Sequence, residues 1–216
     1  MNTLGLQQPG VSFLQNSADL PMIRFGVLGS GKGSNFRALA EAFQAGALGA
    51  QPVIVISDVE QAGILDLGRK FEIPCHFVAP GSFRTKMSPE AEGEIVQLLR
   101  DARVDFVVLA GFMRVIKESL LNAFPGRILN IHPSLLPAFP GLEAWRQAVE
   151  AGVPEAGCTV HLVDAGVDTG KILGQSRVPV ISGDTSESLH ARIQVAEHDL
   201  YPRIIREFAA HLLPRD

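Results

Sequence analysis

Residues 105–111 read Asp-Phe-Val-Val-Leu-Ala-Gly and form the clearest strand signal in a chain of 216 residues. After the first residue the side chains are apolar without alternation, which is typical of a strand buried on both faces. Buried strands of this kind belong to parallel sheets that helices cover on both sides. The stretch therefore predicts an α/β fold.

The segments on either side alternate as such a fold requires. The other expected strands are residues 23–28, 53–56, 75–78, 127–129, 158–163 and 172–181. The expected helices are residues 35–46, 62–71, 89–102, 117–123, 142–150 and 186–213. This alternation predicts a mostly parallel sheet of about seven strands with helices on both faces, in which the last two strands can pair antiparallel at the edge.

The last helix carries one apolar stripe that should face the core. Its apolar positions recur every three or four residues, at Leu189, Ile193, Ala196, Leu200, Ile204, Phe208 and Leu212. Such a stripe is the mark of a helix that packs on a sheet along one side. The predicted fold is thus a single-domain, Rossmann-like α/β fold closed by a long C-terminal helix.

Composition narrows the class of protein. Hydrophobic residues make up 46% of the chain and charged residues 19%, enough for one well-buried core. The formal net charge of -4 argues against a nucleic-acid or membrane surface, because both need a basic field. No apolar run approaches the roughly 20 residues of a membrane span. We therefore expect a soluble, cytoplasmic protein.

The first 22 residues and the two cysteines carry no functional signal. Residues 1–22 lack a basic leader followed by an apolar block, so we expect a flexible extension before a domain at residues 23–213. Cys75 and Cys158 show no pairing pattern, which fits reduced thiols. The histidines outside the motifs below have no ligand spacing, and we expect no metal.

One polar motif follows the strand at 127–129, namely Asn-Ile-His-Pro-Ser-Leu-Leu-Pro at residues 130–137. Side chains alternate across an extended chain, so Asn130 and His132 should point into the same pocket. An amide can donate an N–H to a developing oxyanion, and an imidazole can exchange a proton near neutral pH. The pair indicates acyl-type transfer.

A glycine-rich loop, Gly-Ser-Gly-Lys-Gly-Ser at residues 29–34, joins the first strand to the first helix. It fails as a P-loop because Gly33 stands where a Ser or Thr should hold magnesium, and as a dinucleotide loop because Ser34 replaces the third glycine. Backbone N–H groups at a helix start suit a single phosphate. An ordinary tight turn is the alternative.

Two further segments follow strand ends. Residues 111–116 follow the strand at 105–111, at the edge where open parallel sheets bind ligands. Their apolar side chains could line a pocket for a flat aromatic ligand, and the alternative is a packed loop. Residues 164–170 form an Asp- and Gly-rich loop that by itself is more typical of structure than of catalysis. His161 resembles a packing residue, and Asp58 is expected to cap a helix.

Together these motifs resemble a known family. The matching segments are residues 31–35, 109–114, 130–137, 140–141 and 164–170, in unbroken order within about residues 23–210. They are similar to the phosphoribosylglycinamide formyltransferases, folate-dependent enzymes of purine synthesis. The resemblance implies a formyltransferase fold and transfer of a formyl group from 10-formyltetrahydrofolate to the amine of glycinamide ribonucleotide.

The resemblance also implies residue roles. Asn130, His132 and Asp168 correspond to the catalytic trio. The phosphate of the ribonucleotide would be bound by Gly33, Ser34 and Asn35. The glycinamide and ribose end of the same molecule would be bound by Gln194, Val195, Ala196 and Glu197. The folate-binding residues would be Lys86, Met113, Arg114, Val115, Ile116, Asn130, Asp164, Ala165, Gly166, Val167 and Asp168.

Departures and rivals remain. This chain has Lys32 where the family usually has a small polar residue, often Asn, and Lys86 where the family usually has an Arg. Each difference changes how the side chain would bind an anion. A methionyl-tRNA formyltransferase is disfavoured because no further domain follows the last helix, and a formyltetrahydrofolate hydrolase because residues 1–22 are too few for a regulatory domain. The expected partners are therefore small molecules, without nucleic acid or membrane, and the protein could be a monomer or a homodimer.

Overall fold

The computed structural model describes residues 22–213. The strands are β1 Ile23–Leu28, β2 Ala50–Ser57, β3 Cys75–Phe77, β4 Phe106–Leu109, β5 Ile128–His132, β6 Glu155–Leu162 and β7 Ile172–Pro179. The helices are α1 Ser34–Gln44, α2 Gly63–Lys70, α3 Pro89–Asp101, α4 Glu118–Ala123, α5 Ala144–Glu150 and α6 Ser186–Leu212. The predicted alternation of strands and helices is confirmed.

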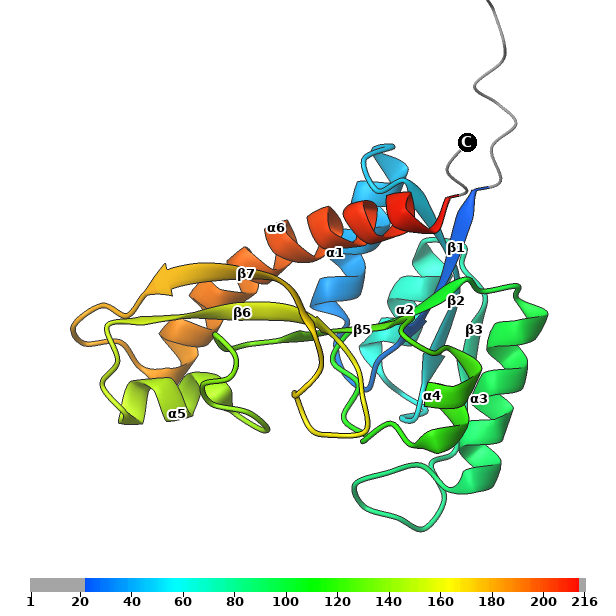
Figure 1. Ribbon diagram of the computed structural model, residues 1–216, viewed down its shortest axis with the longest axis horizontal. Coiled ribbons are helices and arrows are strands. Elements are labelled where there is room, and N and C mark those ends of the chain that lie inside the picture. The colour runs from blue at the N-terminus through cyan, green and yellow to red at the C-terminus, as the bar shows by residue number, and fades with distance from the viewer. Residues whose placement is uncertain (1–21, 214–216) are drawn as a thin grey trace, which may run out of the picture.

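All the strands join one seven-stranded sheet in the order β3-β2-β1-β4-β5-β6-β7. The first five in this order pair in parallel, and β6 and β7 pair antiparallel at one edge (Figure 1). The chain moves outward in one direction from β1 and in the other from β4. The carboxyl ends of these two neighbouring strands form the switch point at which open α/β sheets bind ligands.

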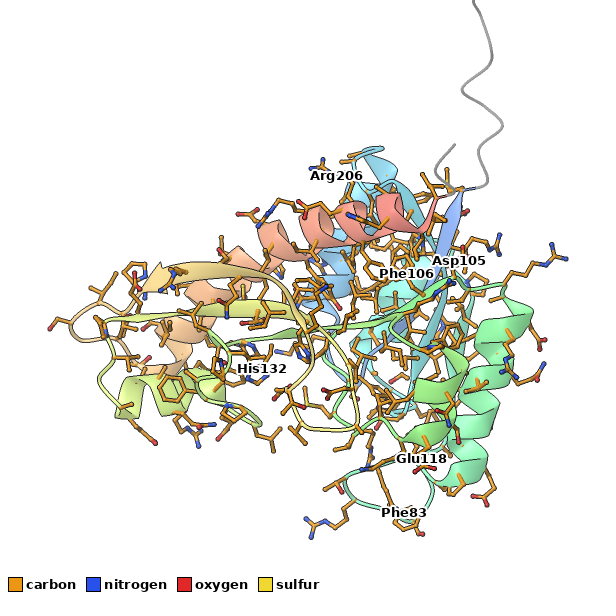
Figure 2. All side chains as sticks on the ribbon, viewed as in Figure 1. Phe83, Asp105, Phe106, Glu118, His132 and Arg206 are labelled. Atoms are coloured by element: carbon orange, nitrogen blue, oxygen red, sulfur yellow. The ribbon has the colours of Figure 1, made fainter. Side chains whose placement is uncertain are left out.

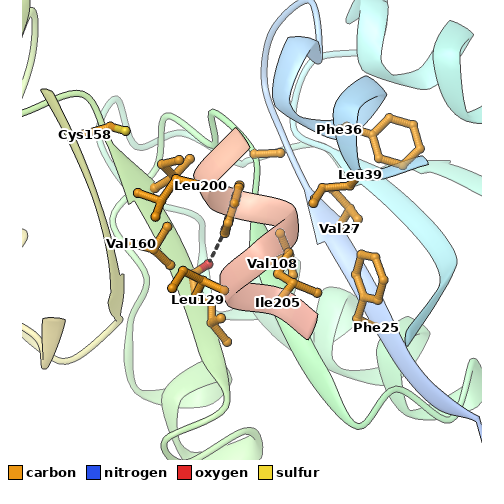
Figure 3. Packing of buried hydrophobic residues seen from close by; sticks show 14 of the residues in the cluster. Phe25, Val27, Phe36, Leu39, Val108, Leu129, Cys158, Val160, Leu200 and Ile205 are labelled. Atoms are coloured by element: carbon orange, nitrogen blue, oxygen red, sulfur yellow. Dashed lines mark hydrogen bonds between the residues drawn. The ribbon is translucent and has the colours of Figure 1, made fainter. Parts of the chain in front are cut away.

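Alternate side chains of the central strands enter two separate cores. Phe25 and Val108 face the core on the side of α1 and α6, whereas Leu28 and Val107 face the core on the side of α3 and α4. Figure 3 shows the first of these cores, where α6 lies over the face of the sheet. The sheet is thus buried on both faces, as the unbroken apolar runs predict.

The C-terminal helix α6 spans 27 residues and crosses one face of the sheet (Figure 1). Leu189, Ile193, Leu200 and Ile204 are buried as the predicted stripe requires. Tyr201 was not in that stripe, yet it is fully buried, and its hydroxyl donates to the carbonyls of Leu109 at 2.9 Å and Leu129 at 3.1 Å. This side chain fixes α6 against β4 and β5, the two strands that lead to the polar motifs.

Several element boundaries differ from the prediction. Strand β4 ends at Leu109, because Gly111 turns the chain with a φ of 73°. Helix α5 begins at Ala144 and not at 142, because Glu143 has a φ of 54° and cannot be helical. Strand β2 is longer than predicted at both ends. Turn geometry near the sheet edge, which periodicity does not report, causes the first two differences.

The expectation for residues 1–22 falls outside the described residues, except for Met22. Within residues 22–213, no helix is long and apolar enough to cross a membrane. Both cysteines are free thiols. Burial raises the pKa of Cys158 to about 12, so this thiol stays protonated and is a poor nucleophile.

Candidate active site

A cavity of about 580 Å³ opens at the carboxyl ends of β4 and β5. Its walls come from parts of four segments, at residues 109–116, 130–133, 141–145 and 161–168. Apolar and aromatic side chains, including Trp145, line much of it, and a few polar groups converge at one end. A cavity of this size and lining suits a drug-sized or cofactor-sized organic ligand.

Asn130 and His132 are the polar residues that β5 places in this cavity. They alternate with Ile131 along the strand, so both side chains lie on the same face, as the sequence predicts. In the antiparallel pairing, Asn130 lies opposite His161 and His132 opposite Thr159. His132 is 5% exposed, and Figure 2 shows it between α5 and the loop that joins β6 to β7.

The imidazole of His132 lies between two acceptors. Its Nε2 is 2.9 Å from the carbonyl oxygen of Phe139, and its Nδ1 is 3.4 Å from Oδ2 of Asp168. A carbonyl can only accept, so Nε2 must carry a proton. A ring protonated on both nitrogens donates to both acceptors. The N–H at Nδ1 can then also donate a hydrogen bond to a ligand in the cavity.

The loop that supplies the Phe139 carbonyl is tied down by the neighbouring strands. The buried hydroxyl of Thr159 on β6 donates to the carbonyl of Ser134 at 2.6 Å and accepts from the amide of Leu136 at 3.0 Å. The amide group of Gln175 on β7 donates to the Leu136 carbonyl at 2.8 Å. His132 is therefore positioned by hydrogen bonds outside the cavity as well as within it.

Asp168 reaches the site from the loop between β6 and β7, on a backbone with a φ of 55°. Its Oδ2 also accepts from the backbone amide of Gly141 at 2.8 Å. Burial alone would raise the pKa of this carboxyl, but the adjacent imidazoles of His161 and His132 and the hydrogen bond from the Gly141 amide outweigh it and lower the pKa. Asp168 is therefore an ionised partner for a protonated ring.

The rest of this loop is built to hold that position. Oδ1 of Asp164 accepts from the amide of Gly166 at 3.0 Å and from the hydroxyl of Thr169 at 2.7 Å, which closes a turn. At Gly170 a side chain would meet the carbonyl oxygen of Leu162 at 1.7 Å, so the close approach to β6 requires glycine. Asp164 thus orders the loop. Gly166 and Val167 line the cavity, and Ala165 does not.

His161 is a site residue that sequence reasoning missed. It is 2% exposed, its Nδ1 lies 2.8 Å from the carbonyl oxygen of Leu162, and its Nε2 lies 3.2 Å from Nδ2 of Asn130. Nδ1 must donate to the carbonyl, so in the neutral ring Nε2 accepts from Asn130 and fixes the orientation of its amide. Nε2 also lies 3.6 Å from Oδ1 of Asp168, which is too long for a hydrogen bond.

The glycine loop lies at the switch point, outside the lining of the cavity. Gly33 has a φ of 77°, and a side chain there would meet Ile64 at 2.9 Å, so glycine suits this turn. Helix α1 starts at the next residue with no side-chain cap. Asn35 in its first turn donates from Nδ2 to Oε2 of Glu197 on α6 at 2.9 Å. The two predicted ribonucleotide segments, 33–35 and 194–197, are therefore in contact.

Glu197 is buried at 5% exposure beneath this contact. Burial raises the pKa of its carboxyl to about 7, although the hydrogen bond from Asn35 opposes the shift. The other members of the segment differ in position, because Gln194 and Ala196 are half-buried and Val195 is 64% exposed. Only Glu197 and Asn35 thus present a fixed polar pair.

This burial gives a prediction on stability. Because the folded state binds the Glu197 proton more tightly than the unfolded state, the protein should lose stability as pH rises from about 4.5 to above 7, by up to roughly 3 kcal/mol. The variant Glu197→Gln should lack this part of the pH dependence. Urea unfolding at pH 5 and pH 8 measures the difference between the two proteins, and an equal pH dependence would contradict the assignment.

The expected cavity wall at 113–116 follows β4. The amide of Met113 donates to the hydroxyl of Ser30 at 2.8 Å, and the amide of Val115 donates to the carbonyl of Thr85 at 2.8 Å. Arg114 lines the cavity, but its Nε donates to Oδ2 of Asp58 at 2.7 Å. The expectation that Asp58 caps a helix is wrong, because α2 has Ala62 at its cap and Asp58 is paired with Arg114.

Lys86 lies beside the wall but does not line the cavity. It forms an isolated bridge with Val115, and its ammonium group lies 4.3 Å from the centre of the Phe83 ring. Figure 2 shows Phe83 on the loop that precedes α3. The ammonium group of Lys86 is thus placed over Phe83, outside the cavity lining. Among the described residues, no group of three or more His, Cys, Asp or Glu is placed to hold a metal ion.

Known proteins resemble this chain over most of its length. Phosphoribosylglycinamide formyltransferase from Bacillus subtilis is 41% identical over 186 residues, which are 86% of this chain and 94% of that protein. The trifunctional purine biosynthetic protein adenosine-3 of Drosophila pseudoobscura pseudoobscura is 44% identical over 203 residues, or 93% of this chain and 15% of that protein.

Solved structures agree with the sequence relatives. The crystal structure of glycinamide ribonucleotide transformylase 1 from Symbiobacterium toebii has a TM-score of 0.84 and 47% identity, covering 90% of this chain and 91% of that one. Residues 23–205 match the family described as formyl transferase. That match spans every strand and most of α6. The chain belongs to the formyl transferase family.

Proposed function

We propose that this protein transfers a formyl group from 10-formyltetrahydrofolate to the amine of glycinamide ribonucleotide, a step of purine synthesis, and that residues 23–213 form the catalytic domain. The observation that carries the proposal is that Asn130, His132 and Asp168 line one cavity, with Nδ1 of His132 3.4 Å from Oδ2 of Asp168. The relatives named above support the choice of substrates.

The reaction needs protein groups that stabilise the formyl group as it is attacked, and it needs no nucleophile from the protein. The substrate amine attacks the formyl carbon, a C–N bond forms, and the carbonyl electrons move to oxygen. An N–H of Asn130 and a proton of His132 stabilise this oxyanion. When the intermediate collapses, the bond to N10 of the folate breaks, N10 takes a proton, and the former amine loses one.

Asp168 and His161 support these two groups. The ionised carboxylate of Asp168 balances the charge on a protonated His132. His161 accepts one N–H of Asn130, so the second N–H is left to point at the oxyanion. Preorganised donors of this kind act without reorganisation at the moment of reaction, which is why such sites are effective.

The cavity is assigned to the folate. The amides of Met113 and Val115 are directed at Ser30 and Thr85, and successive amides of an extended segment alternate in direction. The N–H groups of residues 114 and 116 make no hydrogen bond to the described part of the chain, so they are free to bond the polar edge of a pterin ring. Trp145 supplies an aromatic wall, stacked on His190 with ring centroids 3.8 Å apart.

The ribonucleotide is assigned to the glycine loop and to α6. Backbone N–H groups at the start of α1 and the side chains of Ser34 and Asn35 suit its phosphate. Glu197 accepts a hydrogen bond from Asn35 and so lies beside this phosphate site, where its carboxyl group can bind the ribose or glycinamide end of the ribonucleotide. Lys32 can add a point charge to the phosphate.

The direct test is to follow folate absorbance with purified protein and 10-formyltetrahydrofolate, with and without glycinamide ribonucleotide. Transfer requires the ribonucleotide, and product formylation should match folate release one to one. Folate release at the same rate without the ribonucleotide would instead show a formyltetrahydrofolate hydrolase, the nearest alternative with the same catalytic groups.

The phosphate assignment gives a separate prediction. Asn35→Ala removes one polar contact to the ribonucleotide and should weaken its binding by about tenfold, while folate affinity changes little. Calorimetric titration with each substrate measures both affinities. Gln44→Ala, at the exposed end of the same helix, is the control. Unchanged ribonucleotide affinity in Asn35→Ala would exclude this role.

A further inference from the structure

A buried ion pair joins strand ends beside the cavity. Asp58 follows β2, Arg114 follows β4, and Arg114 Nε donates to Asp58 Oδ2 at 2.7 Å. The two side chains are only 1% and 17% exposed. A charge left in such a place without its partner is strongly unfavourable. The pair therefore ties residue 114 of the cavity wall to the end of β2.

The other oxygen of Asp58 reaches the same wall by a second route. Ser30 donates from its hydroxyl to Asp58 Oδ1 at 2.5 Å, and this hydroxyl accepts from the amide of Met113 at 2.8 Å. The amide of Ser30 also donates to the carbonyl of Gly111 at 3.0 Å. One carboxylate thus holds the wall through a charged contact and through a neutral hydroxyl.

Arg114 extends the network to the loop before α3. Its Nη1 donates to the carbonyls of Phe83 and Arg84, at 3.0 and 2.5 Å. With Nε on Asp58, both of these nitrogens serve protein acceptors. These two nitrogens thus hold the end of β2 and the loop before α3 against the cavity wall.

We propose that Asp58 is a positioning residue for the folate cavity, acting through Arg114 and Ser30. The network fixes the cavity wall, because it holds the amide of Met113 on Ser30 and the side chain of Arg114 on Asp58, and both of these residues line the cavity. Loss of the carboxylate releases both contacts, so the wall is no longer held in the shape that receives the folate. This inference rests on the proposed function, since it assigns the wall to the folate.

The test is Asp58→Asn in the full-length protein. We expect the KM for 10-formyltetrahydrofolate to rise about tenfold, while kcat and the KM for the ribonucleotide stay within about threefold. The chain has a single tryptophan, Trp145, and it lines the cavity, so its fluorescence reports folate binding without turnover. The dissociation constant for 10-formyltetrahydrofolate should rise in parallel with the KM.

A double variant separates positioning from general destabilisation. Asp58→Asn with Arg114→Gln leaves no unpaired buried charge and allows one amide to bond the other, so folate affinity should recover relative to Asp58→Asn alone. The control is Asp184→Asn, which breaks a similarly buried pair with Arg192 outside the cavity lining. Its folate KM should remain that of the unaltered protein.

Two results would overturn the inference. One is an unchanged folate KM and dissociation constant in Asp58→Asn, and the other is an equal rise of both in Asp184→Asn. The failure of the proposed function has a different signature, because the unaltered protein would then bind folate by Trp145 fluorescence but transfer no formyl group to the ribonucleotide.

Discussion

Replacement of His132 by alanine should lower kcat for formyl transfer by about 10³-fold while both substrates still bind. The ring supplies a proton or a cation where the oxyanion forms, and this interaction exists only in the transition state. A loss of this kind lowers kcat and kcat/KM together and leaves dissociation constants nearly unchanged. Steady-state rates, together with Trp145 fluorescence for folate binding, measure the two effects separately.

The His132 variant needs evidence that the site remains folded. Alanine at this place leaves the Phe139 carbonyl without its partner, although the loop is still held by Thr159 and Gln175. Urea unfolding and the position of the Trp145 emission report the fold and the cavity. His211→Ala, at the exposed end of α6, is the matched control and should keep full activity. Near-normal turnover in His132→Ala would remove His132 from the mechanism.

The sheet was predictable because it is recorded in local patterns. Unbroken apolar runs such as 106–109 reveal burial on both faces, and the four- and three-residue spacing of Leu189, Ile193 and Ala196 reveals a helix on one of them. The shared direction of Asn130 and His132 also follows from local alternation. These features depend on neighbours along the chain.

Other features depend on residues that are distant in sequence. His161 enters the site because the antiparallel register places it opposite Asn130, and the sequence contains no signal for that register. Asp58 pairs with Arg114, 56 residues away. The burial of Glu197 requires α6 to lie against α1. In each case a tertiary contact, and not a local preference, decides the role of the side chain.

Asp168→Asn should reduce kcat by about 10²- to 10³-fold with little change in substrate binding. Asparagine keeps the shape of the side chain and one oxygen for the amide of Gly141, but it removes the negative charge that faces His132 and His161. Without that charge a protonated His132 is less stable. The alkaline limb of the pH–rate profile, which reports the group that must be protonated, should therefore move to lower pH.

The two largest effects should not add if His132 and Asp168 work as one unit. In that case the double variant His132→Ala with Asp168→Asn should be about as slow as the slower single variant, because the carboxylate acts through the ring. The low pKa of Asp168 also implies that its contribution is fully present above the ordinary carboxyl range and is lost only as pH falls through the lowered value. Rates measured from pH 5 to pH 8 should then show no ionisation of Asp168. A double variant slower than either single variant by the full product of the two effects would show that Asp168 acts on the reacting atoms independently of His132.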